Sequence, residues 1–142
     1  MRRRILLALL ILLLVFIWGH SCMPRDLSRE ESSALLGLLD PELAPEEGQE
    51  NEALHLLRKL AHFTEFFCLG CVLALLLPFR RNSQLLAAGL GLLTGLIDET
   101  IQIFSGRGSA VSDVWLDFSG AAAAIALLDL VRLLQLRRCD RP

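Results

Sequence analysis

The stretch LLAAGLGLLTGLIDETIQIF, residues 85–104, decides the fold class of this chain. Its first part, from Leu85 to Ile97, is apolar or small, and the adjacent carboxylates Asp98 and Glu99 then interrupt the run. A helix of this length can cross the hydrocarbon of a bilayer, which takes about 20 residues. Because a carboxylate inside such a helix is energetically unfavourable, Asp98 and Glu99 indicate a functional or structural site in a membrane protein.

The composition of the whole chain also indicates a membrane protein. The 142 residues are 54% hydrophobic, and their mean hydropathy is +0.51. This length predicts one domain over residues 1–142. The formal net charge of −2 gives no reason to expect a nucleic-acid partner, and no motif predicts a cofactor.

Apolar residues are concentrated in four blocks that are long enough, or nearly so, to span a bilayer. We expect transmembrane helices at about 5–23, 60–79, 85–104 and 114–134, with an outer loop at about 24–58 and a basic tail at 135–142. The predicted fold class is all-α, a polytopic membrane protein with its four helices in a compact bundle. Its oligomeric state is not predicted, and its expected surroundings are membrane lipids.

The first block has an alternative interpretation as a cleavable signal peptide, because Arg2, Arg3 and Arg4 precede its apolar core. The residues Gly19-His20-Ser21-Cys22 make a poor cleavage pattern, so a retained helix is the preferred interpretation.

The arginines predict the orientation of the chain, because short cytoplasmic segments of membrane proteins are enriched in Lys and Arg. With both termini in the cytoplasm, the inner side holds Arg2, Arg3, Arg4, Arg80, Arg81, Arg132, Arg137, Arg138 and Arg141. The outer side then holds Arg25, Arg29, Arg58, Lys59 and Arg107, four of them in a long acidic loop. Asp129 and Arg132 are expected to form an ion pair at the inner surface.

The outer loop contains one segment with helical signals. Ser28 and Glu31 match a capping box, and leucines follow up to Leu39, so we expect a short amphipathic helix at the membrane surface. The acidic residues 42–52 have the composition of a solvated linker. From Ala53 the chain is expected to be helical again.

Charged and polar residues of three predicted helices fall at one depth. At a rise of about 1.5 Å per residue, all of them lie within roughly 10 Å of the outer surface. Such groups should face the bundle interior or a wet cavity rather than lipid. We therefore predict a pocket lined by Lys59, His62, Asp98, Glu99, Gln102, Arg107, Asp113 and Asp117, with Glu65 as a further candidate.

Three motifs within this set resemble those of VanZ-like membrane proteins. They are Lys59-x-x-His62-Phe63-x-x-Phe66, Asp98-Glu99-x-x-Gln102-x-Phe104-x-x-Arg107 and Asp113-Val114-x-x-Asp117-x-x-Gly120. The segment from Ser21 to Ser33 is also similar to the first outer loop of that family. Asp117 is a departure, because Asn often occupies this position. The resemblance implies a small bacterial inner-membrane protein; the family's name-giving member is associated with teicoplanin resistance, and no established catalytic mechanism comes with the family.

The residues leave several interpretations open. The polar set could be an ion-pair network that locks three helices together, with Lys59 and Arg107 neutralising carboxylates. It could bind an anionic envelope component, such as a lipid-linked wall precursor, with Arg107 and the amides of Gly106 and Gly108 facing a phosphate or carboxylate.

It could also belong to an enzyme, a hydrolase or transferase in which His62 is the general base and Glu65 or Glu99 orients it or acts as an acid. Zinc sites usually have several His or Cys ligands, and this set contains one His, so no metal is predicted. A proton-coupled transporter is less favoured, because the charges stop near the outer surface. Cys68 and Cys71 form a C-x-x-C pattern inside an apolar helix, where small packing residues are a simpler interpretation than a thiol oxidoreductase.

Overall fold

The structure is a computed structural model that describes residues 1–39, 52–108 and 110–139. Within these ranges it consists of helices: α1 (Arg2–Ser21), α2 (Arg25–Leu39), α3 (Glu52–Leu76), α4 (Arg81–Phe104) and α5 (Val111–Cys139). Of these, α1, α3, α4 and α5 are each long and apolar enough to cross a membrane. The chain is therefore an all-α polytopic membrane protein, as its composition predicts.

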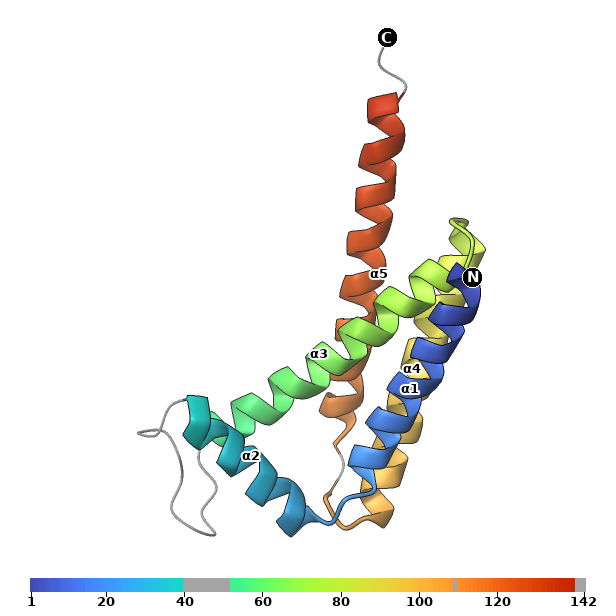
Figure 1. The fold of residues 1–142 in the computed structure, drawn as a ribbon. Helices are drawn as coiled ribbons and strands as arrows, with labels where there is room; N and C mark the ends of the chain where they lie inside the picture. Colours follow the sequence, from blue (N-terminus) through green and yellow to red (C-terminus); the bar gives the residue numbers. More distant parts are fainter. Residues whose placement is uncertain (40–51, 109, 140–142) are drawn as a thin grey trace.

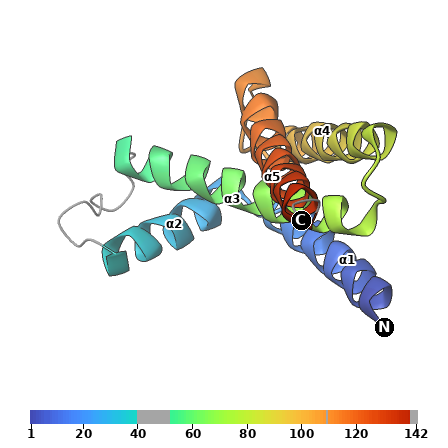
Figure 2. The same cartoon turned by 90° about the horizontal axis from the view of Figure 1, so that it is seen from above.

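Helix α3 is the centre of the arrangement. It contacts α1, α2, α4 and α5, and two further contacts join α4 to α5 and α1 to α4. Figure 1 shows α3 crossing the molecule obliquely and α5 extending beyond the other helices. Helices α1 and α4 meet at their C-terminal ends and diverge toward their first residues (Figure 2). In the view from above, α2 lies beside the first half of α3 (Figure 2). The ends of α3, α4 and α5 that carry the predicted site therefore meet around the first half of α3, next to the end of α1.

Helix α3 begins at Glu52, in agreement with the expectation that the chain is helical again from Ala53, whereas the start of α2 differs from the sequence expectation. Helix α2 begins at Arg25, directly after Pro24, whose fixed φ suits the start of a helix. Ser28 therefore lies inside the helix, and the predicted capping box is wrong. The amide of Ser28 donates to the Pro24 carbonyl over 3.1 Å instead. Most of the acidic linker, residues 42–51, lies outside the described residues.

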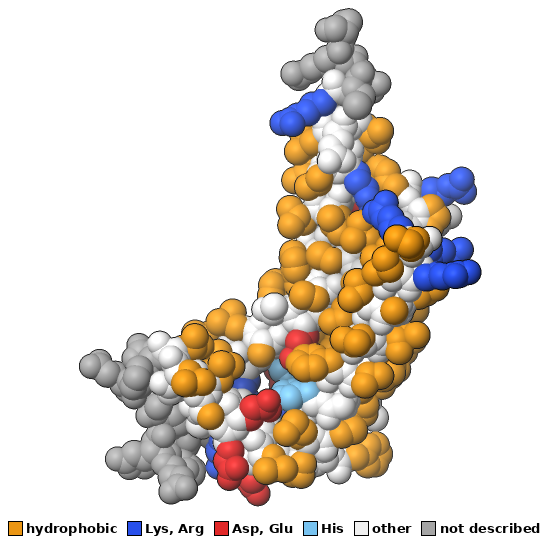
Figure 3. Space-filling model, in the orientation of Figure 1, with side chains coloured by type: hydrophobic (Ala, Val, Ile, Leu, Met, Phe, Trp, Pro, Cys, Tyr) orange, Lys and Arg blue, Asp and Glu red, His pale blue; other side chains and the backbone are white. Residues whose placement is uncertain are grey.

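Helix α4 shows that polar and small side chains lie inside and large apolar ones outside. Its buried residues are Gln84, Ala87, Gly91, Thr94, Gly95, Asp98, Glu99 and Gln102. Its exposed residues include Leu85, Leu86, Leu90, Leu93, Leu96 and Ile97. This distribution suits a helix whose surroundings are lipid, because hydrocarbon accepts leucine while polar groups need protein partners. Hydrophobic side chains cover most of the face seen in Figure 3.

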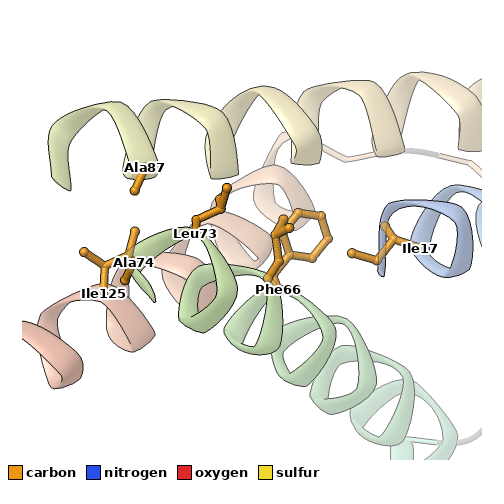
Figure 4. Packing of buried hydrophobic residues seen from close by; sticks show 7 residues of the cluster. Ile17, Phe66, Leu73, Ala74, Ala87 and Ile125 are labelled. Atoms are coloured by element: carbon orange, nitrogen blue, oxygen red, sulfur yellow. The ribbon is translucent and has the colours of Figure 1, made fainter. Parts of the chain in front are cut away.

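A small apolar core holds the helices together above the polar site. Figure 4 shows Phe66 of α3 beside Ile17 of α1, and Leu73 of α3 directed toward Ala87 of α4. Ala74 lies next to Ile125 of α5 on the other side of α3. Within a span these side chains stabilise the fold by van der Waals packing, because lipid tails are as apolar as the side chains themselves.

Glycine residues set the distance between the helices, as their small size predicts. A Cβ atom on Gly70 of α3 would stand 2.4 Å from the carbonyl oxygen of Ala121 in α5. A Cβ atom on Gly91 of α4 would stand 2.9 Å from the Cβ of Ala121, and one on Gly95 would stand 3.3 Å from the Cβ of Asp117. Such positions allow backbones to approach closely, which drives helix association in lipid.

The opposite end of the molecule carries basic residues and an ion pair between Asp129 and Arg132. Arg132 Nη1 lies 3.7 Å from Asp129 Oδ1, which confirms the predicted pair, and its Nη2 donates to the Ala74 carbonyl over 2.8 Å. In Figure 3, Lys and Arg side chains gather near the N-terminus and along the last part of α5.

Candidate functional site

Three helices bring one imidazole and two carboxylates together. His62 of α3 points its Nδ1 atom toward Asp98 Oδ2 of α4 at 3.9 Å and toward Asp117 Oδ1 of α5 at 3.6 Å. Asp98 is fully buried, Asp117 is 1% exposed, and the His62 side chain is 16% exposed. The sequence placed these residues at one depth, and the close contacts of Gly95 and Gly120 bring their helices near enough for the side chains to meet.

Asp98 is held by one hydrogen bond from α1 and one from its own helix, α4. Its Oδ1 accepts from Ser21 Oγ over 2.6 Å, and its Oδ2 accepts from Gln102 Nε2 over 2.8 Å. Ser105 Oγ donates to the Ser21 carbonyl over 2.9 Å, which ties the end of α1 to the end of α4. Sequence reasoning missed Ser21, because serine is common at helix ends and nothing in its spacing links it to Asp98.

Arg107 is positioned by the way α4 ends. Gly106 has a φ of +73°, the left-handed region that favours glycine, and its amide donates to the Ile103 carbonyl over 3.3 Å. The Arg107 amide donates to the Gln102 carbonyl over 3.1 Å. These two bonds form a Schellman motif, which closes a helix and turns the next residue back toward it. The Gly106 amide is thus occupied, and the expectation that it faces an anion is wrong.

The Arg107 side chain returns to the site from this loop. Its Nη1 donates to the His20 carbonyl at the end of α1 over 3.0 Å. Burial lowers the pKa of the Arg107 guanidinium, and the nearby Arg58 lowers it further, whereas Asp98, Glu65 and Glu99 raise it. Because the ordinary pKa of a guanidinium group lies far above neutral pH, Arg107 keeps its positive charge in the site.

A cavity of about 180 Å³ lies next to these residues. It is lined by seven of the eight residues that the sequence predicts as a pocket: Lys59, His62, Glu99, Gln102, Arg107, Asp113 and Asp117. Asp98 lies beneath this lining, in contact with His62. Figure 3 shows histidine and carboxylate side chains reaching the surface near one another between apolar helices.

Glu65 lines a neighbouring recess rather than this cavity. The recess measures about 230 Å³ and shares Arg58, His62 and Arg107 with the first cavity. On its far side, His20 Nε2 of α1 lies 3.4 Å from Glu31 Oε2 of α2. The two cavities therefore adjoin the same central residues from two directions.

The 180 Å³ cavity is also lined by residues that are not part of the predicted pocket. These are Arg25, His55, Arg58, Gly108 and Leu116. His55 and Arg58 could have been included from the sequence, because they precede Lys59 and His62 on one face of the same helix. Arg25 could not, because its position depends on how α2 folds back onto α3.

The fold and the buried polar site define a class of protein: a multi-pass α-helical membrane protein with a charged cluster at one end of its spans. The family model described as VanZ/LLP1 matches residues 6–132, most of the chain. The chain belongs to the VanZ/LLP1 family. No curated protein and no solved structure matches it.

Proposed function

We propose that the protein binds an anionic component of the cell envelope, such as the phosphate or carboxylate of a lipid-linked wall precursor, in the 180 Å³ cavity. The observation that carries this proposal is the gathering of four cationic side chains around one cavity. They are Arg25, Arg58, Lys59 and Arg107. Guanidinium groups bind phosphate and carboxylate with two parallel hydrogen bonds, and Lys adds a point charge.

The carboxylates of the cavity give this site a second recognition function. Glu99 and Asp113 line the same space as the cations. A carboxylate accepts hydrogen bonds from hydroxyl and amide groups. A ligand that combines an anionic group with sugar hydroxyls or peptide amides would therefore match both halves of the lining better than a simple anionic lipid.

The proposed orientation places the cavity at the outer leaflet. Arg2, Arg3, Arg4, Arg80, Arg81, Arg137 and Arg138 all belong to the opposite end of the spans. This distribution supports cytoplasmic termini in the inner membrane of a bacterium, because arginines are retained on the cytoplasmic side. Wall precursors carry their exposed groups at the outer leaflet during assembly, so a link to glycopeptide, and specifically teicoplanin, susceptibility is part of the proposal.

The binding test uses purified full-length protein in phosphatidylcholine nanodiscs, with a long-chain polyprenyl diphosphate as the probe. We expect Arg107→Ala to weaken binding at least about tenfold, equivalent to about 1.4 kcal/mol. Arg137→Ala is the matched control, because it removes the same charge from an exposed position at the other end of α5. If Arg107→Ala folds normally and binds the probe as wild type does, the proposal fails.

A cellular test addresses the envelope role. A strain that lacks the protein is complemented with wild type, His62→Ala, Glu99→Gln or Arg107→Ala, and growth is measured under teicoplanin and other wall inhibitors. At matched membrane abundance, we expect the variants to lose the protection that wild type gives. A purely structural ion-pair network predicts instead that Glu99→Gln and Arg107→Ala lower the abundance of the protein.

A membrane-embedded hydrolase or transferase is the second candidate, and one observation favours it. His62 lines the cavity and also contacts two buried carboxylates, an arrangement in which an imidazole can be oriented as a general base. Hydrolysis of the polyprenyl diphosphate by wild type, lost in a folded His62→Ala variant, would favour this candidate over simple binding. A proton-coupled transporter has less support, because α5 carries no titratable residue between Asp117 and Asp129.

A further inference from the structure

We propose that His62 Nδ1, Asp98 Oδ2 and Asp117 Oδ1 form a binding site for one divalent transition-metal ion. The three ligand atoms lie within 4.8 Å of one another and come from α3, α4 and α5. This site shares His62 and Asp117 with the lining of the 180 Å³ cavity, but its test measures metal binding and does not depend on the anion recognition proposed above.

The distances fit a shared ion better than a hydrogen bond. The imidazole Nδ1 lies 3.6 and 3.9 Å from the two carboxylate oxygens, whereas an N–H···O hydrogen bond is about 2.7–3.2 Å long. Metal–ligand bonds of about 2.0–2.2 Å place two ligands of one ion at most about 4.4 Å apart. Both separations from His62 fall inside this limit. The three ligand atoms together span up to 4.8 Å, so the two carboxylates must move toward each other by a few tenths of an ångström for one ion to bind all three.

Asp117 is a buried carboxylate whose charge favours a cation beside it. Asp117 is 1% exposed, and neither of its carboxylate oxygens accepts a hydrogen bond from the described residues. A buried carboxylate without a partner is destabilising by several kcal/mol, and a metal ion removes this penalty. His62 Nδ1 is likewise buried and has no hydrogen-bond partner among the described residues, and it faces the same point.

Asp98 has the support that a metal ligand normally has. Ser21 and Gln102 hold its two oxygens by hydrogen bonds of 2.6 and 2.8 Å. Hydrogen bonds of this kind orient ligating carboxylates, and their loss typically lowers metal affinity about 10–100-fold. One imidazole and two carboxylates suit Mn²⁺, Fe²⁺ or Zn²⁺, and the cavity beside His62 and Asp117 leaves room for water or a further ligand.

The test measures metal binding by the full-length, tag-free protein in nanodiscs. The protein is treated with EDTA, dialysed against Mn²⁺ or Zn²⁺, and its metal content is determined by mass spectrometry. We expect one ion per chain for wild type and at least about a tenfold loss of affinity for Asp117→Asn and His62→Gln. Asp113→Asn is the matched control, because it lines the same cavity outside the three-ligand set.

A second measurement covers the case in which a variant does not fold. Wild-type protein labelled with ¹⁵N-histidine is loaded with Mn²⁺ and examined by pulsed electron paramagnetic resonance. A hyperfine coupling to one imidazole nitrogen supports the site. No metal retained by wild type, no nitrogen coupling, or unchanged affinity in folded Asp117→Asn would each overturn the proposal.

Discussion

Gly120 of α5 lies directly against the main chain of α3 at Phe63. A Cβ atom on Gly120 would stand only 2.5 Å from the Phe63 carbonyl oxygen. Phe63 follows His62 in the chain, and Gly120 is one helical turn beyond Asp117. The close approach of the two backbones therefore fixes how near His62 and Asp117 can come.

Gly120→Ala should consequently disturb both the helix packing and the site. Because the added methyl group meets backbone atoms, α3 and α5 must separate, and overpacking of this kind destabilises by about 1–3 kcal/mol. Thermal unfolding in detergent measures the effect. Gly89→Ala is the control, because a Cβ there meets nothing within 4 Å, and its midpoint should equal or exceed that of wild type. Equal midpoints for the two variants would show that the helices do not pack as closely as described.

Ser21→Ala should destabilise the protein although it removes a single oxygen atom. The Ser21 hydroxyl donates to Asp98, whose side chain is fully buried, and loss of a donor to a buried acceptor costs about 1–3 kcal/mol, more where the acceptor is charged. The free energy of unfolding can be measured by equilibrium titration with a denaturing detergent. Ser119→Ala, which removes an exposed hydroxyl bonded only within its own helix, should change it by less than about 0.5 kcal/mol. Similar values for both variants would mean that α1 does not support Asp98.

Glu31→Gln should have almost no effect on stability. The carboxylate of Glu31 is 3.4 Å from His20 Nε2, but its side chain is 60% exposed. Exposed ion pairs contribute about 0–1 kcal/mol, because water screens the charges and the side chains lose freedom. The same detergent titration therefore should give a value within about 0.5 kcal/mol of wild type. A loss as large as that of Ser21→Ala would indicate that the contact between α1 and α2 is essential to the fold.

The spans and their polar ends could be predicted from the sequence because hydropathy and charge are local properties. Asp98 and Glu99 interrupt an apolar run, and this interruption is visible in the local sequence without any knowledge of the fold. Helix periodicity also placed Lys59 and His62 on one face of α3. These features depend on a rise of about 1.5 Å and about 3.6 residues per turn, which every helix shares.

The contacts between helices could not be predicted in the same way. The bond from Ser21 to Asp98 joins residues far apart in the chain, and only the packing of α1 against α4 brings them together. The sequence suggests that the Gly106 amide faces an anionic ligand. In the structure this amide instead donates to the Ile103 carbonyl within the Schellman motif. Helix-end geometry had a sequence signal here, because a glycine just beyond an apolar run is the usual signature of such an end.

Gly106→Ala should show whether the end of α4 positions Arg107. Alanine in the left-handed region costs about 1–2 kcal/mol, so we expect a lower midpoint of thermal unfolding. We also expect weaker binding of the polyprenyl diphosphate, because the strained loop no longer directs Arg107 toward the cavity and the His20 carbonyl. Gly19→Ala is the matched control, since Gly19 is helical with open space around its Cβ position, and alanine there should leave both quantities unchanged or raise the midpoint slightly. If Gly106→Ala lowers the midpoint but binds the probe as Gly19→Ala does, the loop stabilises the fold without positioning Arg107 for the ligand.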